Sequence, residues 1–455
     1  MKTRMNFKDE FYQKLKLLVL PIAIQNFMLA LVSATDAIML GWIDQTSLSA
    51  VSLAGQVQFV LSLFISGIAA GAGIMAAQYW GKQDAASIEK VIPIALRTNL
   101  LFSGLFTILA GFCPEMLMRI FTNDAALVAS GSQYLRAVAL SYVLCGISQV
   151  YLILLKNTGH AAISSRISST AVVLNIILNA ILIYGLCGAP ALGIRGAAYA
   201  TVAARVVELI WAYLETKKPE RVRILWNRLF SSAGKILSED FWRYTLPVLA
   251  ASLVWGIAYV LYSVIMGHMG SDAVAANSIT SIAKSLLSCL IRGVSGGAGV
   301  LIGNLLGANE LEKAREYGGR LSRLSIAIGI VTGGLLMLIS PAIVHFAPLS
   351  DTAAEYLQYM LLFCGLNLMA QSVNTTVLDG IFCAGGDAKF DMQGNIGAMW
   401  CFSVPLGFLA AFWLKLPVML VYCIVNLDEI VKLPAVYHHY KKYIWVRNIT
   451  RDVED

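Results

Sequence analysis

The sequence predicts an all-α integral membrane protein, with twelve transmembrane helices in two six-helix lobes that are related by a pseudo-twofold axis along the membrane normal. The first reason is composition: 58% of the 455 residues are hydrophobic and only 13% are charged, whereas soluble domains have about 45–50% and about 25%. The second is a series of apolar segments long enough to span a bilayer, and the third is an internal repeat.

Twelve apolar segments follow one another, separated by clusters of Gly, Pro and charged residues. They are expected at 17–40, 51–79, 92–113, 134–155, 167–187, 196–216, 244–266, 274–303, 319–340, 356–380, 391–414 and 417–436. Most of the 34 Lys and Arg residues lie near the two ends of the chain and in alternate connections. By the positive-inside rule, both termini are therefore expected in the cytoplasm. The net charge of +7 then reflects topology and contact with membrane lipids, and it requires no nucleic-acid partner.

The chain also repeats itself, because the segment from Leu20 to Asp84 aligns without a gap on the segment from Leu246 to Glu310. Matched pairs include Pro21 with Pro247, Gly67 with Gly293 and Gly71 with Gly297. Each copy holds six spans, an even number, so the two copies have the same orientation in the membrane. We interpret the glycines as scaffold that lets helix backbones approach closely. The expected parts are an N-lobe at 1–216, a cytoplasmic linker at 217–243, a C-lobe at 244–440 and a cytoplasmic tail at 441–455.

The first apolar segment contains one acid, Asp36. If the helix enters from the cytoplasm at Lys16, Asp36 lies about 30 Å along the axis, in the outer half of the membrane. A carboxylate there costs several kcal/mol unless it is protonated, paired or facing a water-filled cavity, so it marks a candidate functional site. The alternative is that Asp36 lies at the outer interface and caps the next turn together with Thr35.

Three polar residues are expected at a similar depth in the same lobe. Asn175 and Asn179 are four residues apart and share one face of the fifth span. Thr201 lies in the sixth span, which begins at the outer side. With Asp36 these residues would form an oxygen-rich site for a proton or for Na⁺, the Na⁺ ligands being Asp36, Asn175 and Asn179. The alternative is hydrogen bonding between helices without ion binding.

The C-lobe has different polar residues. Tyr262 stands at the repeat position of Asp36, and the eighth span carries Lys284 and Arg292. These two basic residues are eight positions apart, about 80° around a helix, so both can face one cavity. An ion pair between Arg292 and Asp379 is as plausible as contact with substrate, whereas an unpaired Lys284 would favour an anionic or zwitterionic substrate.

Aromatic residues near the same depth are able to stack on a planar organic substrate, although packing alone would also explain them. The candidate residues of a substrate cavity are Gln58, Trp255, Tyr259, Tyr262, Lys284, Arg292, Asn374 and Asp379.

Other function classes lack their characteristic residues in this sequence. The five histidines lie in loops or in the tail without the acids of a catalytic cluster, and there is no phosphate-binding Gly-Lys-Ser/Thr loop, so neither an enzyme nor an ATP-driven pump is expected. The eight cysteines stand singly in apolar runs, which predicts buried thiols and neither disulfides nor a zinc site. We therefore expect no cofactor beyond a coupling ion, and a monomer.

Several motifs resemble those of the multidrug and toxic compound extrusion (MATE) transporters, in the MOP flippase superfamily. They are the segment from Pro21 to Asp36-Ala-Ile-Met-Leu-Gly41, the loop Gln78-Tyr-Trp-Gly81-Lys82, the stretch from Asn175 to Thr201, and Ala384-Gly-Gly-Asp387. The resemblance covers almost the whole chain and both repeats. It implies an antiporter that extrudes small organic compounds across the cytoplasmic (inner) membrane of a bacterium by a rocker-switch motion, driven by an H⁺ or Na⁺ gradient. It also implies a cation site at Asp36, Asn175, Asn179 and Thr201.

The chain departs from the family pattern at several positions. Members that resemble the NorM branch carry acids where this chain has Trp255 and Asn374, and members that resemble the DinF branch carry one where it has Asn179. Coupling is therefore expected to concentrate on Asp36. The two basic residues of the eighth span do not belong to the drug-pump pattern. They leave open a second function, a flippase for a lipid-linked glycan or another amphiphile, because a basic cavity would suit a pyrophosphate head.

Overall fold

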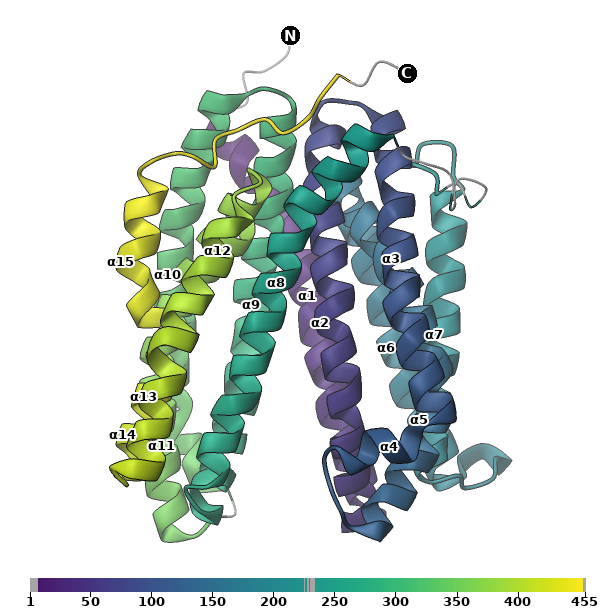
Figure 1. Ribbon diagram of the computed structural model, residues 1–455, viewed down its shortest axis with the longest axis vertical. Helices are drawn as coiled ribbons and strands as arrows, with labels where there is room; N and C mark the ends of the chain where they lie inside the picture. The colour runs from purple at the N-terminus through teal and green to yellow at the C-terminus, as the bar shows by residue number, and fades with distance from the viewer. Residues whose placement is uncertain (1–6, 225, 227–228, 230–233, 348, 453–455) are drawn as a thin grey trace. The chain divides into compact units, whose positions relative to one another are not determined.

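The computed structural model describes residues 7–224, 226, 229, 234–347 and 349–452, and these ranges contain helices and no strand (Figure 1). Ten helical segments of the described chain are long and apolar enough to cross a membrane. One of them, Ala125–Tyr184, contains two of the expected spans, and the last expected span is broken into two shorter helices. All twelve expected segments are therefore helical, and the predicted all-α membrane fold is confirmed.

The helices follow the expected segments closely. The first seven are α1 (Phe7–Gly41), α2 (Gln45–Gly81), α3 (Ala85–Phe112), α4 (Pro114–Arg119), α5 (Ala125–Leu155), α6 (Ala161–Tyr184) and α7 (Ile194–Thr216). The others are α8 (Lys235–Gly267), α9 (Ser271–Gly307), α10 (Leu311–Phe346), α11 (Asp351–Thr375), α12 (Ala388–Asn395), α13 (Val404–Phe408), α14 (Val418–Val425) and α15 (Asp428–Tyr440). Short 3₁₀ or π-helical turns are η1 (Lys156–His160), η2 (Leu186–Gly188), η4 (Thr376–Phe382), η5 (Ile396–Ser403) and η6 (Leu409–Trp413). Residues 225, 227–228 and 230–233 of the expected linker lie outside the described residues.

Aspartates fix the start of several helices. Asp44 accepts a hydrogen bond from the backbone N–H of Ser47 at 2.7 Å, and Asp84 accepts one from Ser87 at 2.9 Å. Each side chain thereby satisfies a backbone donor that has no partner within the first turn. Both caps follow tight connections, so α1, α2 and α3 succeed one another with short loops.

The described chain packs as two compact units. The C-terminal unit contains the residues up to Asn26 together with Ala250–Asp452, and the N-terminal unit contains Phe27–Leu249. Both boundaries fall inside a helix, α1 and α8, a few residues after Pro21 and Pro247. The start of α1 therefore packs with the C-terminal helices, and the start of α8 packs with the N-terminal helices, so the expected linker lies within the N-terminal unit.

Glycines of α2 receive the start of α8 in the N-terminal unit. A Cβ atom added at Gly67 would lie 2.9 Å from the Cα atom of Leu249, and one at Gly71 would lie 2.7 Å from the Cα atom of Thr245. Both distances are shorter than real Cβ contacts allow. The absence of a side chain at these two positions is what lets the backbones of α2 and α8 touch.

The internal repeat makes the same contact in the C-terminal unit, between α9 and the start of α1. A Cβ atom added at Gly293 would lie 2.6 Å from Cβ of Ala23, and one at Gly297 would lie 2.8 Å from Cγ2 of Val19. These four residues occupy the repeat positions of the four in the N-terminal unit. Each copy of the repeat therefore supplies a helix segment to the unit formed mainly by the other copy.

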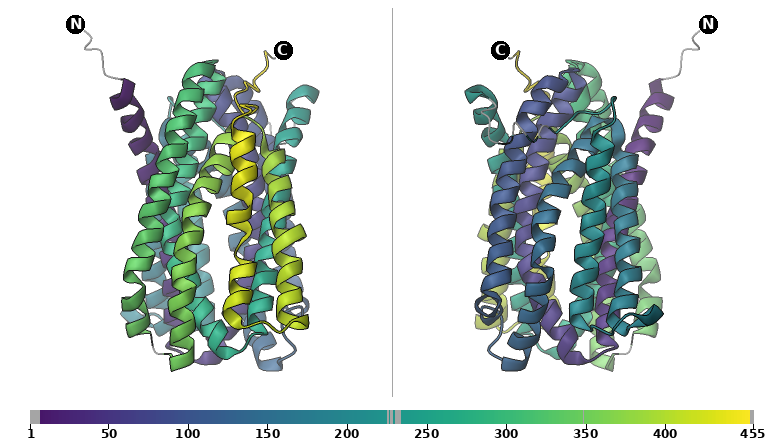
Figure 2. Two further views of the ribbon diagram at one scale, coloured as in Figure 1. Left: turned by 90° about the vertical axis from the view of Figure 1, so that its left-hand side faces the viewer. Right: turned by 90° about the vertical axis from the view of Figure 1, so that its right-hand side faces the viewer.

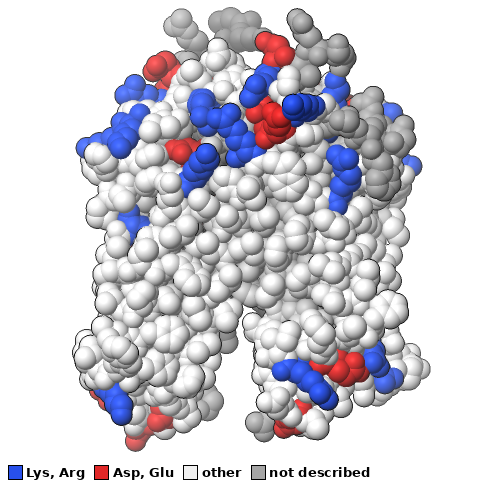
Figure 3. Space-filling model, in the orientation of Figure 1, with Lys and Arg blue, Asp and Glu red and all other residues white. Residues whose placement is uncertain are grey.

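Apolar side chains fill the space between the helices of each unit. Leu61, Val138 and Tyr142 belong to a buried cluster in the N-terminal unit, and Ile265 and Leu336 belong to one in the C-terminal unit. Within each unit the helices run along a common direction (Figure 2). On the face drawn in Figure 3, charged side chains gather toward the upper and lower ends and leave a largely uncharged band between them, as expected for a surface that faces lipid.

Candidate functional site

Asp36 lies on α1 and faces α6 in the N-terminal unit. Its Oδ1 atom accepts a hydrogen bond from Nδ2 of Asn179 at 2.5 Å. The neighbouring hydroxyl of Thr35 donates to the backbone carbonyl of Leu31 at 2.9 Å, within its own helix. The pair therefore does not cap the following turn, and the carboxylate is held by a polar side chain from another helix.

The other polar residues expected at this site form a chain of hydrogen bonds with Asp36. Nδ2 of Asn179 also lies 3.2 Å from Oδ1 of Asn175, and Nδ2 of Asn175 donates to the hydroxyl of Thr201 at 3.3 Å. That hydroxyl in turn donates to the carbonyl of Ala197 at 3.0 Å. The structure thus brings Asp36, Asn175, Asn179 and Thr201 together from α1, α6 and α7.

One acceptor of this cluster has no partner among the described residues. Asn179 is fully buried, and its Oδ1 atom makes no hydrogen bond there. A buried acceptor without a donor costs about 1–3 kcal/mol. Next to a carboxylate, such an oxygen is a suitable ligand for a cation or for a protonated group. Tyr134 of α5, which is also buried, lies close enough to interact electrostatically with Asp36.

The candidate cavity residues fall in both units. Gln58 is half-buried on α2 in the N-terminal unit. Trp255 and Tyr259 of α8 stack on each other, with ring centroids 5.6 Å apart and an angle of 17° between the rings. Tyr262 is buried one turn further along α8. Trp255 and Tyr262 pack in the apolar cluster of the C-terminal unit, whereas Tyr259 is 42% exposed.

Two of the polar candidates already have partners within the C-terminal unit. Nζ of Lys284 donates to Oδ1 of Asn367 at 2.9 Å. Nδ2 of Asn374 donates to the backbone carbonyl of Glu429 at 2.6 Å and to its Oε2 atom at 2.8 Å. Lys284 is therefore not the unpaired cation that the sequence allowed.

The expected ion pair between Arg292 and Asp379 is absent from the described part of the chain. Both side chains are exposed, and their charges interact at a distance longer than an ion pair. Asp379 lies in the π-helical turn η4, whose wider turn rotates the residues that follow Thr376 relative to a regular α-helix. The expected pairing with Arg292 assumed a regular α-helix at Asp379, and the π-helical turn places the side chain elsewhere.

Sequence reasoning missed a buried acid in the N-terminal unit. Glu208 is 1% exposed, and its Oε1 atom accepts from Arg205 at 2.9 Å and from the hydroxyl of Ser148 at 2.6 Å. The spacing of three residues between Arg205 and Glu208 on one helix face was a usable signal.

A second group of missed residues lies at the start of α15. Asp428, Glu429 and Lys432 are all at least nine-tenths buried, inside the last expected span. The spacing of three and four residues between the acids and the lysine indicates one helix face. With Asp391 of α12, the two acids make three buried carboxylates near one buried ammonium group.

A family model named MatE matches residues 21–181 and 247–409, which is most of the chain and both repeats. An uncharacterized transporter of Bacillus subtilis, YisQ, is 21% identical over 94% of this chain and 93% of its own length. The probable multidrug resistance protein YoeA of the same species is 21% identical over 99% and 98%. The probable multidrug resistance protein NorM of Thermotoga maritima is 23% identical over 90% and 87%.

Solved structures match the fold over nearly the whole chain. An outward-facing multidrug resistance MATE family transporter of the MOP superfamily has a TM-score of 0.86 at 20% identity, covering 95% of this chain and 96% of that one. A MOP superfamily transporter from Pyrococcus furiosus, described as having a binding pocket of reversed polarity, matches with the same values. These structures show that the fold is that of the MATE transporters, and the family model, which covers both repeats, shows that the chain belongs to the MatE family.

Proposed function

We propose that the protein is a secondary active exporter, an antiporter that moves small organic compounds out across the cytoplasmic membrane of a bacterium in exchange for H⁺ or Na⁺. The observation that carries this proposal is the bond between Asp36 and Asn179, next to the unpartnered Oδ1 atom of Asn179. Family membership and the names of the relatives support the transport of organic compounds. The protein acts as a monomer with both termini in the cytoplasm.

Coupling requires that the ion bind two conformations with different affinity. In the outward-facing state, Asp36 takes up a proton or Na⁺, and the negative charge between α1 and α6 is neutralised. Asn179 then loses an ionic acceptor, and its hydrogen bonds with Asn175 rearrange. A hydrogen bond to a charged group contributes about 1.5–3 kcal/mol. That difference is large enough to bias two packings of α1 and to weaken substrate binding.

The ion is then released to the cytoplasm after the protein changes to its inward-facing state. For Na⁺, the ligands would be oxygens of Asp36, Asn175 and Asn179, with Thr201 behind them. For H⁺, Asp36 alone binds the proton, and the amides of Asn175 and Asn179 orient its carboxyl group. The two ions differ in the oxygens that they need, so substitution of Asn175 by alanine should impair Na⁺ coupling more than H⁺ coupling.

The test is transport by the purified full-length protein in proteoliposomes. Imposed pH or Na⁺ gradients are applied separately, with a panel of cationic, zwitterionic and anionic compounds. Asp36→Asn is expected to abolish gradient-driven transport, while insertion and folding persist because the amide is close in size and still accepts a hydrogen bond. Glu239→Gln, at a side chain that is 66% exposed in the same unit, is the matched control. Wild-type transport by Asp36→Asn would remove Asp36 from the mechanism.

The second candidate, a flippase for a lipid-linked glycan, depended on two free basic residues in the C-terminal unit. The bond between Lys284 and Asn367 weakens that case, while the exposed Arg292 still supports it. Transfer of a fluorescent pyrophosphate lipid between leaflets of the same proteoliposomes, without an ion gradient, would favour the flippase over the exporter.

A further inference from the structure

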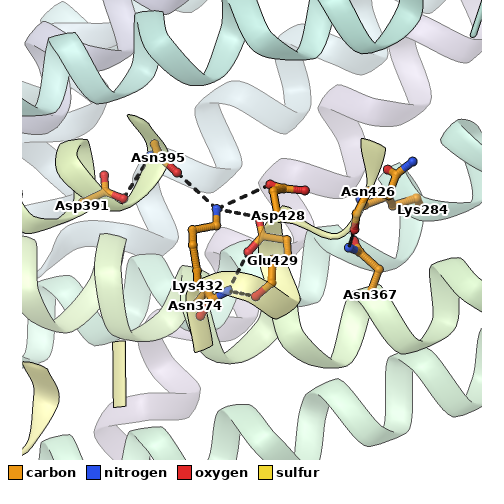
Figure 4. A network of polar contacts seen from close by, with 9 residues as sticks. All are labelled: Lys284, Asn367, Asn374, Asp391, Asn395, Asn426, Asp428, Glu429 and Lys432. Carbon is orange, nitrogen blue, oxygen red and sulfur yellow. Dashed lines mark hydrogen bonds and ion pairs between the residues drawn. The ribbon is translucent and has the colours of Figure 1, made fainter. Parts of the chain in front are cut away.

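The C-terminal unit contains a buried network of charged and amide side chains that the proposed function does not use (Figure 4). Its members, here called the Lys432 network, are Asn374, Asp391, Asn395, Asp428, Glu429 and Lys432. They come from α11, α12 and α15, and none is more than 9% exposed. Buried charges inside a membrane protein are costly, so they mark a functional site by default.

The network is built around a break between α14 and α15. The carbonyl of Asn426, which lies at the break, accepts a hydrogen bond from Nδ2 of Asn367 of α11 at 2.7 Å. One turn of α15 further on, the carbonyl of Glu429 accepts one from Nδ2 of Asn374, also of α11, at 2.6 Å. The two asparagines are seven residues apart and share one face of α11. Broken helices are tolerated at membrane depth where neighbouring side chains satisfy the backbone, and they often carry ion sites.

Lys432 is the centre of the network. Its Nζ atom donates to Oδ1 of Asn395 at 3.1 Å and to Oε1 of Glu429 at 3.2 Å, and it lies 3.6 Å from Oδ2 of Asp428. Glu429 also accepts from Asn374 through its other oxygen, at 2.8 Å. Glu429 therefore has donors on both carboxylate oxygens, which is the environment of an ionised group.

Asp391 extends the network away from the break. Nδ2 of Asn395 donates to Oδ1 of Asp391 at 3.2 Å, one turn earlier on α12. Asp391 is 7% exposed, and it interacts electrostatically with Asp379, whose side chain is exposed. Hydrogen bonds thus link Asp391 through Asn395 to the ammonium group of Lys432, and the exposed carboxylate of Asp379 lies close enough to repel Asp391.

The charges of the network and of the elements packed against it do not balance. Besides its own members, the titratable groups that interact with these carboxylates are Lys284 of α9, Tyr262 of α8, Asp379 of η4 and the thiol of Cys383, and Arg292 of α9 interacts with Asp379. When all are in their usual ionisation states, three cations face four carboxylates. The excess is one negative charge in a low-dielectric interior, which one proton or one monovalent cation would remove.

A proton fits this place better than a metal ion. The ammonium group of Lys432 already occupies the position between the oxygens of Asn395, Asp428 and Glu429. A Na⁺ ion bound to the same oxygens would lie within a few ångströms of that positive charge and be repelled by it. Among the described residues, no group of His, Cys, Asp and Glu side chains is arranged to hold a metal ion. A proton needs one carboxylate oxygen and can enter beside the lysine.

We propose that the Lys432 network is a second proton-exchange centre, which takes up and releases one proton on its carboxylates independently of Asp36. The proton comes from water, converts one carboxylate into a carboxylic acid and leaves by the reverse step, so no other reactant is needed. Asp428 and Asp391 are the acceptors, because Glu429 keeps its donors. The carboxylates share the proton as one coupled group.

Infrared difference spectroscopy of the full-length protein in liposomes tests this proposal without a transported substrate. Spectra are compared between about pH 8 and about pH 6, a range in which exposed carboxylates, with a pKa near 4, remain ionised. In an Asp36→Asn background, a carboxylic-acid C=O band is expected to grow on acidification. Adding Asp428→Asn or Asp391→Asn should remove half of that band or more, whereas Glu312→Gln, at an exposed acid of α10, should leave it unchanged.

The outcome separates this proposal from the function proposed for Asp36. A band that vanishes with Asp36→Asn alone would overturn the second centre and leave the first intact. If a single substitution prevents folding, the paired change Lys432→Met with Glu429→Gln keeps the excess of one negative charge. That variant should retain the band, and loss of the band in a folded sample would contradict the charge balance on which the centre depends.

Discussion

Substitution of Gly71 by alanine is expected to destabilise the N-terminal unit. An added Cβ atom would lie 2.6 Å from Cβ and 2.7 Å from Cα of Thr245, whereas ordinary contacts are 3.4–4 Å. Because one of these atoms belongs to the backbone of α8, no side-chain rotation can make room. The start of α8 would have to move away from α2 by about 0.7 Å.

The size of the effect follows from two opposing contributions. Overpacking of this kind costs about 1–3 kcal/mol, and replacing glycine by alanine inside a helix returns up to about 1 kcal/mol. We expect a net destabilisation of about 1–2 kcal/mol. For a unit of this size, each kcal/mol lowers the unfolding temperature by about 2–4 °C.

Thermal unfolding of the purified protein in detergent, followed by intrinsic tryptophan fluorescence, measures this effect. Gly104→Ala on α3 is the matched control, because nothing lies within 4 Å of a Cβ atom built at that position. The control should unfold at the wild-type temperature or slightly above it. Equal unfolding temperatures for the Gly71 and Gly104 variants would refute the inferred close contact between α2 and α8.

Three further predictions concern buried side chains. Glu208→Gln should destabilise the protein by about 3–5 kcal/mol, since it leaves Arg205 without its ionic partner; a thermal-unfolding temperature equal to that of wild type would contradict it. Asn374→Leu should cost about 1–3 kcal/mol in the same assay, because the buried Oε2 atom of Glu429 loses its donor, and Asn374→Asp should not restore it. Trp445→Ala removes a fully buried side chain and should lower the free energy of unfolding by about 3–5 kcal/mol and expose the tail to limited proteolysis. An unchanged cleavage pattern would show that other contacts hold the tail.

Much of the fold could be predicted because its signals are local. The length of each apolar run identifies a membrane span. Repeat-related glycines such as Gly67 and Gly293 identify the repeat, because both positions need close contact between helix backbones. The cluster around Asp36 was also predictable. The distance of Asp36 along its helix places it at the same depth in the membrane as Asn179, and Asn175 and Asn179 share one helix face. These inferences need no knowledge of tertiary structure beyond the packing of neighbouring spans.

Other features depended on partners that the sequence does not reveal. The break before Asp428 lies inside an apolar run that is typical of one span, and the carbonyl of Asn426 at the break accepts a hydrogen bond from Asn367 of α11. Lys284 was expected to face a cavity, but its partner Asn367 lies far away in the sequence. The rotation at Asp379 comes from a π-helical turn, for which the residues give no periodic signal.

The contacts of the repeat-related glycines bear on how such a chain could have arisen. A polypeptide with a single copy of the repeat would have had an empty groove beside its glycines and a first helix end with nothing to pack on. Two such chains would satisfy each other by swapping those ends, as in a domain-swapped homodimer. Fusion of the duplicated genes would then have kept the swapped helix ends. If the chain is divided before Lys235 into two polypeptides, the two produced together should still assemble, while either one alone should aggregate.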